Sequence, residues 1–406
     1  MFNRRSLLGS GIAATAALAT APVFNRPAWA APRRGDGDRV LVVVELSGGN
    51  DGLNTVVPYG DDAYYRQRPT IGINADELLK LDGEFGLNPG MLGFERLWHS
   101  GDLAIVHGCG YEQPSYSHFT SMAYWHTGAP GGGDEFGWLG RLADAMGEAD
   151  AAGGDSGAGA ELLINIASAQ SLAVKSRRHT PVVFDDPERF QRRAFHSQQA
   201  LMARIDQDDG NAARAYLNDV AKSALGASAR IRRAWSDYRS PVDYGIAPMD
   251  LPKVAACIGA GLPARIYHVA FRNNAFDTHV QQSALHRRLL SYACDGIHGF
   301  IRDLERMGQA DRVVVLVHSE FGRRVPENAN LGTDHGTANL MFLAGRPIKG
   351  GHYGKPPSLT ELTDGENLIH AVDFRRVYAT AIDGWMQPGA ASTVLKGRFE
   401  TLPAFV

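Results

Sequence analysis

The sequence of 406 residues predicts an α/β fold, with a mostly parallel central sheet and helices on both faces. Short apolar runs rich in β-branched residues recur along the chain, as is typical of strands buried on both faces. The first two of these runs end in glycine-rich turns. An amphipathic helix joins two later runs through short connections, and such a strand–helix–strand unit makes a parallel, right-handed crossover.

Each predicted element follows from its own pattern. Six apolar runs are predicted strands: 39–46, 103–107, 161–167, 264–271, 312–317 and 339–344. Apolar residues recur at helical spacing from Leu285 to Leu304, which predicts a helix between the fourth and fifth strands. Residues 149–160 are small and polar without periodicity, so we expect a loop. Residues 187–239 are charged and helical in pattern, and predict a helical excursion from the domain.

The N-terminus has the pattern of an export signal. Arg4 and Arg5 precede an apolar stretch from Leu7 to Phe24, and the small-x-small sequence 28–30 follows as a cleavage site. The stretch is rich in Ala, Gly and Thr, so its weak hydrophobicity suits a twin-arginine signal better than the alternative, a membrane-spanning helix. We therefore expect residues 1–30 to be a signal peptide, with the twin-arginine translocase as a partner and the periplasm as the destination.

Charge and composition narrow the choice of partners. Residues 1–30 hold three arginines and no acidic residue, so their removal changes the formal net charge from −3 to −6. A mildly acidic surface argues against nucleic acids and anionic membranes as partners. No later segment has eighteen uninterrupted apolar residues, so we expect no stable membrane insertion.

Three cysteines occur, none of them in a CxxC pair: Cys109, Cys257 and Cys294. An odd count excludes a complete disulfide framework but allows one bridge. We expect all three to be small, buried apolar residues.

Polar clusters occur where predicted strands end. Three lie after the first, fourth and fifth strands and one lies just before the sixth, at residues 48–52, 276–279, 319–323 and 332–336. The carboxyl ends of parallel strands meet at one edge of a sheet, where ligands bind. Aspartate, glutamate and histidine side chains that converge there suit a divalent metal ion.

Together, the motifs GGNDGLNTVVP, PSYSHF, FDTH, SEFGR, NANLGTDHG and GGHYG resemble the exported bacterial family called domain of unknown function 1501. This resemblance covers residues 39–384 and leaves 385–406 as a C-terminal tail. It implies the alkaline-phosphatase-like superfamily of phosphatases, sulfatases and phosphomutases. The implied fold is a three-layer sandwich, with a two-metal site at the strand ends.

The resemblance also implies roles for residues. Asp51, after the first strand, matches a metal ligand. Ser117 matches the nucleophile, with Ser115 as the alternative, although Ser117 could instead cap the next helix. Asp277 and His279 match a further pair of ligands, but one residue separates them where the superfamily usually has three.

Two alignments remain open for the last ligands. In the preferred one, Glu320 replaces the usual aspartate and His335 is the final histidine. In the other, Asp334 and His335 form the usual pair, and His352 is the final histidine.

The implied activity is hydrolysis of phosphate or sulfate esters with Zn, Mn or Ca as the cofactor. Arg323 or Arg324 would hold the anionic group of a small-molecule or polymer substrate by a bidentate fork. The alternative function is a non-catalytic binding or assembly protein that retains the fold, which the irregular ligand pattern favours.

The export signal can be tested by replacing both Arg4 and Arg5 with lysine. We expect the double variant to accumulate as an uncleaved precursor in the cytoplasm, because the route depends on the arginine pair. Cell fractionation and the size of the protein check this. Normal recovery from the periplasm would contradict the twin-arginine prediction.

Overall fold

The computed structural model describes residues 38–132, 134–152, 162–190 and 226–406. The predicted signal peptide, residues 153–160 of the expected loop and the middle of the 187–239 excursion lie outside these ranges. Residues 149–152 are helical, so the loop prediction is wrong for them. The central sheet has the strand order β11-β5-β10-β9-β1-β8-β6-β7, and β14 also pairs with β5. Its strands are β1 Val40–Glu45, β5 Leu103–Gly110, β6 Leu163–Ile166, β7 Val182–Phe184, β8 Ile266–Ala270, β9 Val313–His318, β10 Asn339–Ala344, β11 Gly351–Tyr353 and β14 Val372–Asp373.

All six predicted strands are therefore confirmed, and the sheet is mostly parallel. The central strand β1 pairs in parallel with β8 and β9. Strand β10 runs antiparallel to both of its neighbours, β5 and β9. Because of this reversal, the start of β10 lies at the edge where β1 and β9 end. The segment that precedes β10 thus reaches the same edge as the segments that follow β1, β8 and β9.

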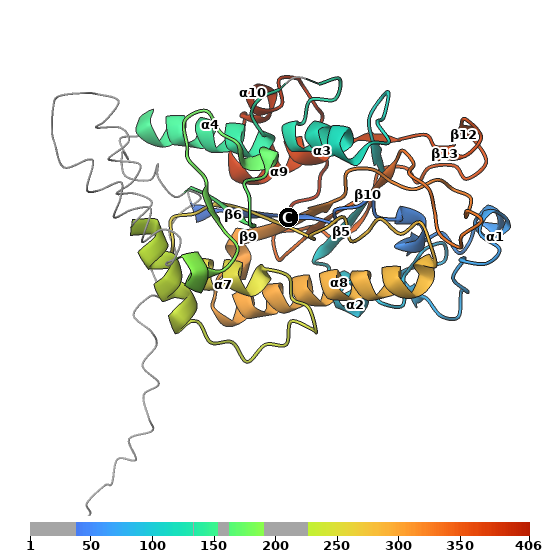
Figure 1. Cartoon of the computed structure of the whole chain (residues 1–406), viewed down its shortest axis with the longest axis horizontal. Coiled ribbons are helices and arrows are strands. Elements are labelled where there is room, and N and C mark those ends of the chain that lie inside the picture. Colours follow the sequence, from blue (N-terminus) through green and yellow to red (C-terminus); the bar gives the residue numbers. More distant parts are fainter. Residues whose placement is uncertain (1–37, 133, 153–161, 191–225) are drawn as a thin grey trace, which may run out of the picture.

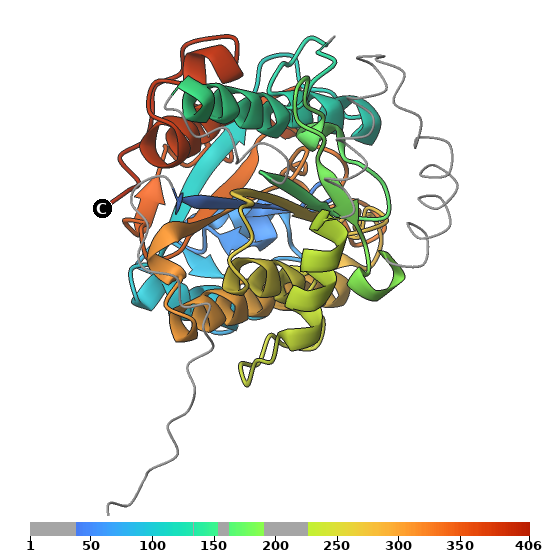
Figure 2. The same cartoon turned by 90° about the vertical axis from the view of Figure 1, so that its left-hand side faces the viewer.

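Helices cover both faces of the sheet, which confirms the predicted three-layer arrangement. Figure 1 shows α3, α4, α9 and α10 above the sheet and α2, α7 and α8 below it, and Figure 2 shows the same layers end-on. The helices are α1 Asp62–Gln67, α2 Leu92–His99, α3 His118–Thr127, α4 Trp138–Ala152, α7 Leu251–Gly259, α8 Gln282–Arg306, α9 Phe374–Ala381 and α10 Ala391–Val394. Helix α8 contains the predicted 285–304 helix and is confirmed.

Each face of the sheet has its own core, because alternate side chains of a strand point to opposite faces. In β1, Val40, Val42 and Val44 belong to the core between the sheet and helices α2, α7 and α8. Leu41 and Val43 belong to the core between the sheet and helices α3, α4 and α9. Glu45 continues the second series, so its carboxylate enters the layer between the sheet and α3.

Smaller elements complete the domain. Two minor sheets are formed by β2 Val56–Val57, β3 Leu79–Lys80 and β4 Gly86–Leu87, and by β12 Leu362–Thr363 and β13 Asn367–Leu368. Short turns of helix occur at η2 Gly52–Asn54, η3 Leu172–Val174, η4 Ala310–Arg312 and η5 Ile382–Met386. Residues 226–237 are helical, within the predicted excursion.

The segment expected as a C-terminal tail packs on the domain. Trp385, Val394 and Leu402 are buried in the core between the sheet and helices α3, α4 and α9. Phe405 also forms a β-bridge with Ile348.

The cysteine and membrane predictions can be compared with the described part of the chain. Cys109, Cys257 and Cys294 are all free and buried, as expected, so the possible single disulfide is absent. Across the described ranges, the longest and most apolar helices fall short of what a membrane crossing requires.

Candidate metal centre

Three imidazoles and one carboxylate converge at the edge where β1, β8 and β9 end. His118 is the first residue of α3, Asp277 and His279 lie between β8 and α8, and His335 precedes β10. The Nε2 atoms of His279 and His335 lie 3.0 and 3.1 Å from Oδ1 of Asp277. Nε2 of His118 lies 3.3 Å from Oδ2 of the same carboxylate. His118, Asp277 and His335 present ligand atoms that all lie within 4.8 Å of one another.

The Nδ1 atoms of the three imidazoles are oriented by contacts with oxygen atoms. In each ring Nδ1 lies beside an oxygen that only accepts: Glu320 for His118 at 2.9 Å, Asp334 for His279 at 3.1 Å, and the carbonyl of Tyr116 for His335 at 2.8 Å. With its proton on Nδ1, each neutral ring can offer its Nε2 lone pair to a metal ion, and each Nε2 also lies 3.0 to 3.3 Å from an Asp277 oxygen to which it could donate instead. Metal-binding histidines are usually oriented in this way.

The Nε2 atoms of the three imidazoles lie close together. Those of His279 and His335 face each other at 2.9 Å. That of His118 is buried and makes no hydrogen bond within the described residues. A buried polar atom without a partner is costly. A cation bound among the three nitrogens would remove this cost, so these residues fit a metal ion.

Electrostatics keep Asp277 ionised. Nη2 of Arg323 donates to its Oδ1 at 2.8 Å. Burial alone would raise the pKa of Asp277, but hydrogen bonds from His335 and Arg323 lower this pKa to about 2. The pKa of His118 is raised, chiefly by its hydrogen bond to Glu320, whereas burial lowers the pKa of His335.

Glycine allows the two histidine-bearing loops to approach closely. A Cβ atom at Gly332 would lie 2.3 Å from both the carbonyl carbon and the oxygen of His279. At Gly336 it would lie 2.4 Å from the carbonyl carbon of Arg323. Such contacts are too short for any side chain. The glycines of GTDHG therefore let His335 come within reach of His279.

Asp51 occupies a different place from the one expected of a ligand. It is fully buried, and its Oδ2 accepts from Nη1 of Arg68 at 2.6 Å and from the amide of Gln282 at 2.5 Å. Its Oδ1 has no hydrogen-bond partner in the described part of the chain. Burial would raise the pKa of Asp51, but the charge of Arg68 outweighs this effect and lowers the pKa. The structure thus shows Asp51 in a buried ion pair with Arg68.

Glu320 and Asp334, the competing candidates of the two alignments, both lie behind a histidine. Oε1 of Glu320 accepts from Nδ1 of His118 and from the backbone amide of Gly48, 2.8 Å away. Oδ1 of Asp334 faces Nδ1 of His279. Both carboxylates therefore orient imidazoles instead of pointing at the centre.

His352, the final histidine of the second alignment, belongs to another group. Its Nδ1 lies 2.8 Å from Nε2 of His107, and its Nε2 lies 3.1 Å from Asp82. The structure therefore brings His335, and not His352, to Asp277.

The side chain of Arg323 donates its hydrogen bonds to other parts of the protein. Its side chain is buried, and it donates to the carbonyl oxygens of Gly48, Gly49, Phe276 and Thr333 as well as to Asp277. All of its donor nitrogens are thus engaged within the fold, and it presents no open fork to a ligand.

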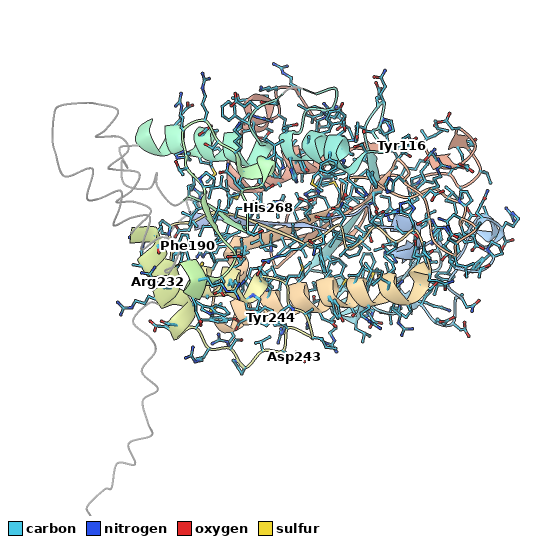
Figure 3. The ribbon with its side chains drawn as sticks, viewed as in Figure 1. Tyr116, Phe190, Arg232, Asp243, Tyr244 and His268 are labelled. Carbon is cyan, nitrogen blue, oxygen red and sulfur yellow. The ribbon has the colours of Figure 1, made fainter. Side chains whose placement is uncertain are left out.

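Ser117 borders the centre. It is exposed and stands at the N-cap of α3, where its side chain makes no capping hydrogen bond. Its neighbours on both sides are bound to the centre: the Tyr116 carbonyl by His335, and His118 by Asp277 and Glu320. Figure 3 shows Tyr116 beside α3 at the surface. Ser115 instead accepts from the backbone amide of Ser117 through its hydroxyl, at 3.3 Å.

Two residues of this region were not among the site residues predicted from the sequence. His118 follows Ser117 in the PSYSHF motif, and a histidine at a predicted helix start beside a candidate nucleophile could have signalled a ligand. Arg68 carried no such signal, because 17 residues separate it from Asp51 and only the fold brings the two together.

The family model described as "Protein of unknown function (DUF1501)" matches residues 38–381. This chain belongs to the DUF1501 family. The resemblance of its motifs to that family is therefore confirmed. A search of curated proteins finds no match for the DUF1501 chain.

Solved structures similar to the DUF1501 chain are distant. Phosphonate monoester hydrolase SpPMH from Silicibacter pomeroyi is 10% identical, with 89% of this chain and 75% of that chain covered and a TM-score of 0.37. The C-terminal periplasmic domain of EcEptC from Escherichia coli, in a complex with Zn, is 10% identical, with 77% and 74% covered and a TM-score of 0.35. TM-scores this low show only a distant likeness, and the chemistry of the DUF1501 chain follows from its own residues.

Replacement of Gly332 by alanine tests the convergence of the two loops. The new methyl group would collide with the backbone of His279, so the loops must separate and His335 must move away from His279. We expect metal affinity to fall by about 10- to 100-fold, the usual loss when the residues around a ligand are disturbed. Titration with Zn²⁺ against a chelating dye measures the change.

Gly83→Ala is the matched control for Gly332→Ala, because a Cβ there meets no atom within 4 Å. This variant should bind Zn²⁺ as the wild type does. Wild-type affinity in Gly332→Ala would show that the loops do not form the centre.

Asp51→Asn separates an ion-pair role from a ligand role. Removing one partner of a buried pair typically costs about 3–5 kcal/mol, so we expect a loss of this size at pH 7 with metal content unchanged. The folded-state pKa of Asp51 is lowered, so its stabilisation is fully present above the unfolded pKa of about 3.9 and is lost as pH falls through the folded pKa. Urea unfolding at several pH values should show the variant and wild type converging in acid.

Asp311→Asn, at a side chain that is 80% exposed, should change the free energy of unfolding by no more than about 0.5 kcal/mol at any of these pH values. Loss of bound metal in Asp51→Asn would instead identify Asp51 as a ligand.

Proposed function

We propose that this protein is a metal-dependent hydrolase of phosphate or sulfate esters that acts on an anionic small-molecule or polymer substrate. The grouping of three imidazole Nε2 atoms around the Asp277 carboxylate carries the proposal, because these residue types could together hold a divalent ion. From Arg4 and Arg5 we also propose that the protein is exported by the twin-arginine route and acts in the periplasm.

The donor atoms favour some ions over others. Imidazole nitrogens with one carboxylate suit Zn²⁺ or Mn²⁺, whereas Ca²⁺ prefers six to eight oxygen ligands. Of the three ions that the sequence suggested, Zn²⁺ and Mn²⁺ therefore fit this centre best. A metal bound there would act as a Lewis acid on the ester and lower the pKa of a nearby hydroxyl.

Ser117 is the nucleophile of the proposed reaction. An unassisted serine hydroxyl is a poor nucleophile at neutral pH, so it needs a group that stabilises its alkoxide. Ser117 stands at the N-terminus of α3, where the helix dipole favours negative charge. Its position between Tyr116 and His118, both held by the centre, keeps its backbone fixed beside the ligand set.

Recognition of the anionic group depends on residues other than Arg323, whose donors are engaged within the fold. Arg324 is the remaining candidate of the two. It pairs with Glu366 through Nη1, and its Nε makes no hydrogen bond among the described residues. The backbone amides at the start of α3 are a second source of anion binding.

A non-catalytic binding or assembly protein is the second candidate function. One observation favours it: Asp51 and Arg323, both expected in the reaction, are engaged in buried contacts of the fold itself. In this case the centre would hold a metal as a structural element, and Ser117 would have no chemical role.

The two functions are distinguished by Ser117→Ala. We expect this variant to lose turnover of an aryl phosphate or aryl sulfate by on the order of 10³-fold or more, because the nucleophile is gone. Metal content and melting temperature should remain close to those of the wild type, since the hydroxyl makes no capping bond. Elemental analysis, thermal unfolding and a spectrophotometric ester assay give the three measurements.

Ser115→Ala is the matched control, three residues from His118, and should retain most of the turnover. His335→Asn should lose both metal and turnover, because it removes a ligand. If the wild type binds metal but cleaves neither ester with Zn²⁺ or Mn²⁺ added, the binding function replaces the hydrolase.

A further inference from the structure

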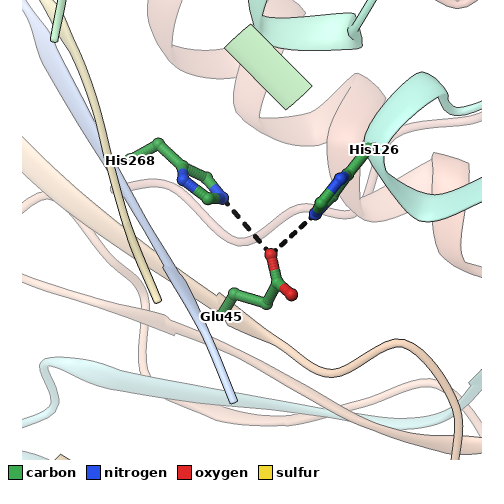
Figure 4. A group of neighbouring side chains, drawn as sticks. All are labelled: Glu45, His126 and His268. Atoms are coloured by element: carbon green, nitrogen blue, oxygen red, sulfur yellow. Dashed lines mark hydrogen bonds and ion pairs between the residues drawn. The ribbon is translucent and has the colours of Figure 1, made fainter. Parts of the chain in front are cut away.

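A second group of ionisable side chains lies inside the protein, between the sheet and α3. The carboxylate of Glu45 meets the imidazoles of His126 and His268 there (Figure 4). Oε2 of Glu45 lies 2.7 Å from Nε2 of His126 and 3.4 Å from Nε2 of His268. All three side chains are less than 9% exposed. Figure 3 shows His268 within the layer between the sheet and the upper helices.

The fold explains why these three residues meet. Glu45 is the last residue of β1 and points to the α3 face, as Leu41 and Val43 do. His268 of β8 is paired in register with Val43, two residues before Glu45, so the two side chains lie on one face of neighbouring strands. His126 comes from the last turn of α3, which lies above them.

Hydrogen bonding around His268 favours a hydrogen-bonded cluster over a metal site for this group. The Asn165 side-chain oxygen accepts from the backbone amide of Ser171 at 2.9 Å, which fixes the orientation of the Asn165 amide. Its NH₂ group therefore faces Nδ1 of His268, at 3.2 Å. Nδ1 must accept, so neutral His268 carries its proton on Nε2, toward Glu45. In His118, His279 and His335, by contrast, it is Nδ1 that faces a carboxylate or carbonyl oxygen away from the centre.

Glu45 is thus a buried carboxylate that receives donors. The hydroxyl of Ser47 donates to its Oε1 at 3.0 Å, and the two imidazole Nε2 atoms approach Oε2. Burial would raise the pKa of Glu45, but the charge and hydrogen bond of His126 and the contact with His268 lower it well below its usual value. A buried ionised group is expensive, and it is retained where it specifies one geometry.

The contacts of Glu45 specify the position of α3 on the sheet. Two glutamates hold this helix: Glu320 binds His118 at its first residue, and Glu45 binds His126 near its end. These histidines are eight residues apart, or about 12 Å along the helix axis. Because the two contacts lie at opposite ends of α3, they help to fix both its position and its direction, together with the packing of Trp125 in the core.

The same two glutamates also hold the loop after β1. Glu45 accepts from the hydroxyl of Ser47, and Glu320 accepts from the backbone amide of Gly48. Both carboxylates therefore connect α3 to the loop that Arg323 binds through the carbonyls of Gly48 and Gly49. A shift of α3 would move His118 and Ser117 relative to Asp277.

We propose that Glu45 and His126 are positioning residues for the candidate metal centre, which hold α3 so that His118 and Ser117 reach Asp277. This inference rests on the proposed metal-dependent function and adds residues to it that make no contact with the ligand set. Displacement of a reacting group by about 1 Å can cost about 100-fold in rate, so a remote contact of this kind matters for chemistry.

Glu45→Gln tests the proposal, because it keeps the shape of the side chain and removes its charge. We expect the Kd for Zn²⁺ or Co²⁺ at the centre to rise by about 10- to 100-fold. Hydrogen exchange of the Ser121 amide, which donates to the Ser117 carbonyl at 2.8 Å, should accelerate about tenfold as the start of α3 loosens. His126→Gln should give the same changes, and the double variant should add little to either.

Asp303→Asn is the matched control. Asp303 is a fully buried carboxylate in α8, held by Tyr238, Tyr244 and Ser240, and it makes no contact with α3. This variant should lose melting temperature as Glu45→Gln does, but should leave both the metal Kd and the exchange of the Ser121 amide unchanged. The comparison separates positioning of α3 from a general loss of stability.

Several results would overturn the proposal. If Glu45→Gln and His126→Gln lower the melting temperature with no change in metal Kd or Ser121 exchange, as the control does, these residues do not position α3. A wild type with two metal equivalents that loses one in Glu45→Gln, with the centre unchanged, would show that the buried group binds an ion. If the wild type binds no metal, the proposed function fails, and Ser121 exchange alone decides whether Glu45 positions α3.

Discussion

The guanidinium group of Arg323 holds together the loops on which the candidate centre depends. It is buried, and it donates to the Gly48 and Gly49 carbonyls after β1, to Phe276 and Asp277 after β8, and to Thr333 before β10. Burial lowers the pKa of Arg323, but an arginine starts so high that it stays charged. One planar cation with five donors can serve three loops at once, which no other side chain can do.

Helix α3 provides the remaining part of the centre and is held by a different interaction. Glu45 and Glu320, at the ends of the neighbouring strands β1 and β9, bind one histidine at each end of the helix. The sheet is covered on both faces by packed apolar cores, so its strand ends form a rigid base. Ligands carried on loops and on a helix terminus thus acquire the precision of the sheet.

Carboxylates in this protein differ in role because they differ in partner. Asp51 faces Arg68, whose fixed positive charge leaves little attraction for a metal ion. Asp277 faces the Nε2 atoms of imidazoles that could bind a cation together with it. Glu45 faces His268, whose Nε2 carries a proton, and so it remains a hydrogen-bond acceptor. The partner, and not the acid itself, decides which carboxylate can bind a metal.

The sequence alone determined the strands, the long helix and the edge of the sheet where function lies. These features depend on local periodicity: β1 and β9 are continuous apolar runs, and α8 repeats its apolar residues at helical spacing. It also placed Asp277, His279 and His335 among the candidates, because polar residues beside glycines at strand ends stand out from the runs around them.

Only the tertiary structure decided which candidates meet. The antiparallel direction of β10 brings His335 to the edge where β1 and β9 end, and strand direction leaves no local pattern. The pairing of Asp51 with Arg68, the entry of His118 from α3, and the place of Glu320 behind that histidine all depend on contacts between distant segments. Periodicity records which face of an element is buried, but it does not record what that face will touch. Long-range packing therefore separated the candidate metal ligands from the residues that orient them.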